Sequence, residues 1–120
     1  MLNTAFDTEQ KLNIQNFLPR RRELIEMSNF FNSFSDPTRL KILSALSLSP
    51  MFVYELSSIV DTNQTTVSHQ LKLMRERGIV QFSRLGKMLR YEISSKFVAQ
   101  TLECGVDFLN NNMDEEDFST

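Results

Sequence analysis

The stretch TNQTTVSHQLKLMRERGIV, residues 62–80, contains the chain's single histidine and predicts a helix with two different sides. At about 100° per residue, Val67, Leu71 and Met74 fall on one side of a helix that runs from Gln64 to Arg77. The opposite side carries Gln64, Thr65, Ser68, His69, Lys72 and Arg75. We therefore expect one apolar face that is buried and one polar face that is open to solvent.

Both ends of this helix carry residues that suit helix termini. Asn63 precedes the helix, and its side chain can accept a hydrogen bond from a free backbone N–H of the first turn. Gly78 follows it, and glycine tolerates the left-handed conformation at a helix C-terminus. The segment 53–60, VYELSSIV, predicts a short apolar helix before residues 61–63. Two helices joined by so short a turn predict a helix-turn-helix.

A β-hairpin is predicted after Gly78, where the apolar period changes to two. The alternating apolar residues are Val80, Phe82, Leu89, Tyr91 and Ile93. Residues 85–87, Leu-Gly-Lys, make a short turn between the two strands. Arg84 and Lys87 lie in this hairpin, which could act as a wing that contacts DNA phosphate groups beside the second helix.

Helical segments flank this centre on both sides. The periodicity predicts helices over about residues 7–18, from Pro19 to Phe34, from Asp36 through Leu46, and from Ser95 to Leu109. In the third of these, Asp36 is the expected N-cap and Leu40, Leu43 and Leu46 the expected buried row. Residues 47–51 are expected to form a loop. We expect an N-terminal helical arm over 1–18, a single domain over 19–111, and an acidic, disordered tail over 112–120.

The charge is unevenly distributed along a chain whose formal net charge is −2. Residues 72–90 contain six cations and a single glutamate, whereas residues 103–117 contain six acidic residues and no cation. A basic block beside an exposed polar helix favours a nucleic-acid partner, because base edges and phosphates require such donors and acceptors. Solvated surface charges, with His69 as an ordinary surface histidine, are the simpler alternative.

Other classes of protein receive little support from the sequence. One cysteine, Cys104, allows no intrachain disulfide and fits a reducing compartment. No apolar run approaches the length of a membrane span, and residues 1–10 lack a secretory signal, so we expect a cytoplasmic protein without a membrane partner. No nucleophile, metal-ligand or phosphate-loop motif is present. We therefore expect neither catalytic residues nor a resident metal or cofactor.

Two segments together resemble a known family. SDPTRLKILSAL, residues 35–46, and VYELSSIVDTNQTTVSHQLKLMRERGIVQFSRLGKMLRYEI, residues 53–93, resemble the ArsR/SmtB family of winged-helix transcriptional repressors. The resemblance extends over about residues 30–109. It implies a mainly α fold with a small β-hairpin, a winged helix-turn-helix that dimerises through its N- and C-terminal helices. It also implies a homodimer that binds a palindromic operator in double-stranded DNA and is released by an inducer.

The resemblance also assigns residues to DNA binding. By position, Gln64, Thr65, Ser68, His69 and Lys72 match the helix that reads DNA, and Arg84 and Lys87 match the wing. Arg75 lies on the same polar side and completes the expected set. A winged-helix module that contacts only proteins is the alternative, and it would show no salt-dependent DNA binding.

The inducer does not follow from the resemblance. Many members sense metals through a cysteine pair on the short helix before the reading helix, or through Asp and His ligands on the last helix. Here residues 53–60 contain no cysteine, and residues 94–109 contain no histidine. Cys104 is expected to be a small buried hydrophobic residue beside Phe97 and Phe108, with redox or effector sensing as the alternative.

Overall fold

The computed structural model describes residues 6–119, with side chains described as far as residue 112. The elements are α1 (Thr8–Phe17), α2 (Arg21–Asn32), α3 (Pro37–Leu48), β1 (Met51–Phe52), α4 (Val53–Val60), α5 (Gln64–Glu76), β2 (Val80–Leu85), β3 (Met88–Ile93) and α6 (Lys96–Ser119). The described chain is thus mainly α with a small sheet, as predicted.

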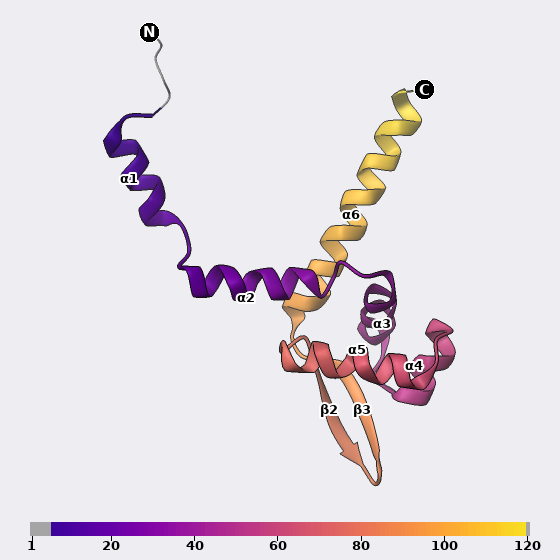
Figure 1. The fold of residues 1–120 in the computed structure, drawn as a ribbon. Helices are drawn as coiled ribbons and strands as arrows, with labels where there is room; N and C mark the ends of the chain where they lie inside the picture. The colour runs from indigo at the N-terminus through magenta and orange to yellow at the C-terminus, as the bar shows by residue number, and fades with distance from the viewer. Residues whose placement is uncertain (1–5, 120) are drawn as a thin grey trace.

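The elements form a central body from which both ends of the chain project (Figure 1). In the body, α3, α4 and α5 lie at the base of the β2–β3 hairpin, whereas α1, α2 and most of α6 extend away from it (Figure 1). The Cα radius of gyration is 19.8 Å, compared with about 14 Å for a compact domain of this length. The difference shows that the terminal helices do not fold back on the body.

The hydrophobic core lies entirely within this body. Its fully buried side chains come from α3, α4, α5, residues 79–80 and the start of α6, and include Ile42, Leu43, Leu56, Val67, Leu71, Met74, Ile79, Val80 and Val98. Neither α1 nor α2 contributes a buried residue. The prediction that Val67, Leu71 and Met74 form the buried face of α5 is confirmed, because all three are 0% exposed.

The buried row predicted for α3 is wrong at one position. Leu43 and Leu46 are buried, but Leu40 is 37% exposed, and Ile42 and Ala45 are buried in its place. The reason is that α3 has apolar residues on most of its circumference, including Leu48, so the sequence pattern does not identify the core side uniquely.

The helix caps follow the sequence predictions. The Asn63 Oδ1 atom accepts a hydrogen bond of 2.8 Å from the Thr66 N–H, and the Asp36 carboxylate accepts one of 3.0 Å from the Arg39 N–H. Gly78 has φ +75°, a left-handed conformation that glycine adopts readily. These caps fix where α3 and α5 begin and where the chain leaves α5 for the hairpin.

The predicted hairpin is part of a three-stranded antiparallel sheet with the order β1-β3-β2. β2 pairs with β3 from Val80↔Ile93 to Leu85↔Met88, and Gly86 takes φ +63° in the turn. The loop predicted over 47–51 is wrong at Met51, which belongs to β1 and pairs with Tyr91. A strand of two residues is too short to show a period of two.

The last helix is longer than predicted. α6 continues to Ser119, beyond the expected end near Leu109, and no Gly or Pro interrupts the sequence after Gly105. Its first turns contact the body, where Val98 is buried and Leu102 packs against the core. The expectation of a disordered tail over 112–120 falls mostly on residues 113–120, whose side chains lie outside the described part.

Candidate nucleic-acid interface

Helix α5 presents the predicted polar residues outward. Its buried face, Val67, Leu71 and Met74, holds the helix on the body, so the opposite face points to solvent. All six predicted residues of this helix are exposed: Gln64, Thr65, Ser68, His69, Lys72 and Arg75. The structure therefore brings them together on one side of one helix, which is the arrangement needed to enter a DNA groove.

The turn between α4 and α5 is held by its own hydrogen bonds. Asp61 adopts a left-handed conformation with φ 53° at the end of α4. The Thr62 N–H donates to the Ser57 carbonyl oxygen at 3.1 Å, and the Ser57 hydroxyl donates to the Thr62 carbonyl oxygen. The Lys41 ammonium reaches the Val60 carbonyl oxygen at 3.4 Å. Ser57 and Thr62 were not predicted from the sequence, because their roles depend on the conformation of this turn.

The hairpin carries the two remaining predicted residues. Arg84 and Lys87 are exposed near the tip, and the hairpin extends well beyond the helices of the body (Figure 1). The structure therefore places these two cations on a separate projection from the α5 residues. Arg75 links the two elements, since its guanidinium carbon lies 4.1 Å from the centroid of the Phe82 ring on β2. This cation–π contact was not predicted from the sequence.

The cations of this surface are not neutralised within the described residues. The described part of the chain has one ion pair, Arg22–Glu26 at 3.5 Å on α2, and none on α5 or the hairpin. Lys72 and Arg75 also line a shallow surface hollow together with Glu76. Because each exposed cation that neutralises a phosphate releases a counterion from the nucleic acid, this surface is suited to a polyanion.

Cys104 is exposed in the described chain, so the prediction that it is buried is wrong. The inward side of α6 is formed by Val98 and Leu102, which pack on the body. Phe97 and Phe108, the expected neighbours that would cover the thiol, are themselves 65% and 64% exposed. Within the described residues, no three His, Cys, Asp or Glu side chains gather in a group that could hold a metal ion.

An exposed polar helix that follows a short helix and precedes a projecting cationic hairpin defines a winged helix-turn-helix protein of the DNA-binding class. Comparison with known proteins supports this assignment. The family model described as bacterial regulatory protein, arsR family, matches residues 36–81. The cadmium resistance transcriptional regulatory protein CadC of Listeria innocua is 34% identical over 83 residues, which cover 68% of this chain and 70% of that protein. The chain therefore belongs to the ArsR/SmtB family, whose members are DNA-binding transcriptional regulators rather than enzymes.

Two further comparisons extend this result. A transcriptional repressor SmtB homolog of Synechocystis is 32% identical over 73 residues, covering 61% of this chain and 55% of that protein, so the chain spans about half its length. The homodimeric winged helix-turn-helix DNA-binding domain of a Mycobacterium bovis protein has a TM-score of 0.72 at 20% identity, covering 93% of this chain and 95% of that one. The second likeness shows the fold. Among the described residues, no helix is long and apolar enough to span a membrane.

Proposed function

We propose that this protein is a cytoplasmic repressor that binds a palindromic DNA operator as a homodimer. The observation that carries the proposal is the exposed polar face of α5, which Val67, Leu71 and Met74 hold rigidly on the core. A helix presented in this way can lie in a major groove with its N-terminal residues on the base edges. The relatives named as transcriptional repressors support the same assignment.

The two groups of polar residues have different roles in this proposal. Ser68, His69 and their neighbours on α5 read bases, since hydrogen bonds to base edges carry sequence information. Arg84 and Lys87 contact phosphates beside the bases that α5 reads, and these contacts add affinity for DNA of any sequence. The N-terminus of α5 itself favours a phosphate, because its free N–H groups and the helix dipole attract an anion.

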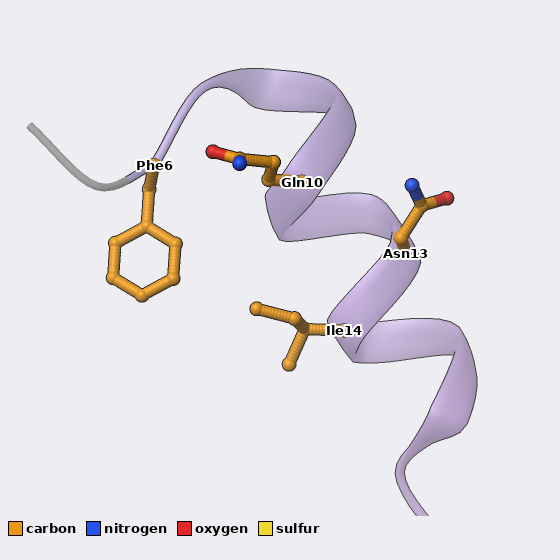
Figure 2. A pocket seen from close by; sticks show the side chains of 4 residues that line it. All are labelled: Phe6, Gln10, Asn13 and Ile14. Carbon is orange, nitrogen blue, oxygen red and sulfur yellow. The ribbon is translucent and has the colours of Figure 1, made fainter.

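The terminal helices supply the surface for dimerisation. The exposed apolar side chains of α1, α2 and α6 include Leu12, Ile14, Phe17, Leu24, Ile25, Met27, Phe31, Val106, Phe108 and Leu109. Figure 2 shows Phe6 and Ile14 on the same side of α1, where they line a shallow hollow with Gln10 and Asn13. Removing this apolar surface from water favours association with another apolar surface. The homodimeric state of the Mycobacterium bovis protein supports a second copy as the partner.

The experiment that tests the proposal is selection of bound fragments from a random DNA pool, combined with sedimentation analysis of the protein and its complex. We expect a dimer that selects two inverted half-sites separated by about one helical turn, roughly 10 base pairs. The affinity should fall steeply with salt, as phosphate contacts require. A monomer that binds one half-site as tightly as the full palindrome would refute the proposal, as would the absence of salt-dependent binding.

A further inference from the structure

Two arginines from different helices converge on the C-terminal end of α2. Arg39, on α3, donates from Nε to the Ser33 carbonyl oxygen at 3.2 Å and from Nη2 to the Asn32 carbonyl oxygen at 2.9 Å. Its third nitrogen, Nη1, reaches the Gln70 Oε1 atom on α5 at 3.3 Å. One guanidinium thus joins the end of α2 to the middle of α5.

Arg77, the C-cap of α5, contacts the same end of α2. Its Nη1 atom lies 2.9 Å from Asn32 Oδ1, 3.2 Å from Ser33 Oγ and 3.4 Å from the Asn29 carbonyl oxygen. Ser33 is completely buried, and its hydroxyl donates to the Asn29 carbonyl oxygen at 3.1 Å. The two guanidinium groups and this serine form a connected polar network, which we call the arginine clamp.

The clamp compensates for weak apolar packing of α2. No side chain of α2 is buried, and Phe30 on α2 and Phe34 just after it are only partly buried where they pack against the core. The carbonyl groups at the end of a helix lack intrahelical partners and carry partial negative charge, so cations there are favourable. Charge-assisted hydrogen bonds are roughly twice as strong as neutral ones. The clamp is therefore a principal determinant of the direction in which α2 leaves the body.

We propose that Arg39 and Arg77 are positioning residues that fix the orientation of α2 relative to α5 and thereby set the half-site spacing that the dimer recognises. This inference rests on the proposed function, in which α2 belongs to the dimer interface and α5 reads DNA. In a twofold dimer, a change in the angle between these helices displaces both reading helices relative to the axis. Such a change alters the separation of the two half-sites without altering any contact to a base.

The test measures affinity for a set of palindromes whose half-site spacing is shifted by one or two base pairs in either direction. The variants are Arg77→Gln and the milder Asn32→Leu, which removes one acceptor. For both we expect affinity at the preferred spacing to fall by about 2- to 30-fold, the range for changes along a coupling network. Affinity at the other spacings should change less, so that the spacing profile becomes flatter while the preferred bases stay the same.

Two matched controls accompany these variants. Asn32→Asp keeps an oxygen acceptor for Arg77 and should keep the wild-type spacing profile. Ser47→Ala removes an exposed hydroxyl that donates to the Ser44 carbonyl oxygen within α3 rather than to α2, and should also keep it. Equal loss of affinity at every spacing, or an unchanged profile in both Arg77→Gln and Asn32→Leu, would overturn the clamp proposal. Failure of the proposed function is distinguishable, since the wild-type protein itself would then show no preference for a palindrome.

Discussion

Replacement of Asn63 by Asp should separate folding stability from DNA affinity. The Asn63 Oδ1 atom accepts the N-cap hydrogen bond of 2.8 Å from the Thr66 N–H, and a carboxylate can make the same bond. Asn and Asp are about equal as N-caps, and a negative charge at a helix N-terminus is worth about 0.3–1 kcal/mol. The free energy of unfolding should therefore stay unchanged or rise slightly. Asn63→Ala, in contrast, should lower it by about 0.5–2 kcal/mol.

Asn63→Asp should lower the affinity for DNA, although it does not lower folding stability. In the proposed complex, the N-terminal end of α5 approaches a phosphate, so the new carboxylate is repelled. Two unit charges about 4 Å apart in bulk water interact by about 1 kcal/mol. A dimer carries two copies, which gives about 2 kcal/mol or roughly a 30-fold loss of operator affinity.

The assays are chemical denaturation for stability and fluorescence anisotropy with a labelled operator for affinity. Both should be run on the wild type, Asn63→Asp and Asn63→Ala, with affinity measured at low salt where repulsion is least screened. If Asn63→Asp folds normally and binds the operator as tightly as the wild type, then the N-terminus of α5 does not approach a phosphate. The geometry proposed for the complex would then be wrong.

Three further predictions concern the reading helix, the core and the thiol. Ser68→Ala should weaken binding to the preferred operator by about 1–3 kcal/mol and relax base preference, which competition titrations measure. Arg84→Ala should instead weaken binding to all sequences alike. It should also reduce the salt slope by about one unit in a salt titration, because one phosphate is no longer neutralised. Leu71→Ala, at a 0% exposed position, should lower the free energy of unfolding by about 2–5 kcal/mol in a denaturant titration. Cys104→Ser and the wild type should bind the operator equally with and without peroxide, and selective release of the wild type would identify Cys104 as a sensor.

The features that the sequence predicted correctly are those with a regular period or a local cap. The face of α5 repeats at helical spacing, and Asn63 and Gly78 mark its ends within a few residues. The strand β1 could not be predicted in this way, because its pairing partner Tyr91 lies 40 residues away from Met51 in the sequence. The core side of α3 was only partly predictable, since its apolar residues surround the helix.

For the expected DNA-binding residues, the sequence predicted which side chains are exposed. It did not predict which of them contact residues on other elements. Polar residues on one side of α5 are exposed because the other side is buried. The contact between Arg75 and Phe82 depends on the direction in which the chain turns at Gly78. The spacing of apolar residues does not encode that direction. The arginine clamp was missed for the same reason, since Arg77 meets residues more than 40 positions earlier in the sequence.

The absence of buried side chains in α1 and α2 has a thermodynamic consequence for the chain. Helices of 10 and 12 residues are marginally stable in water unless they pack against another surface. In the proposed dimer that surface is a second copy, so the helical order of residues 8–32 is linked to self-association by mass action. Dilution should then melt these helices before it affects the winged body. The cellular abundance of the regulator would thus determine how much of it has an ordered N-terminal region.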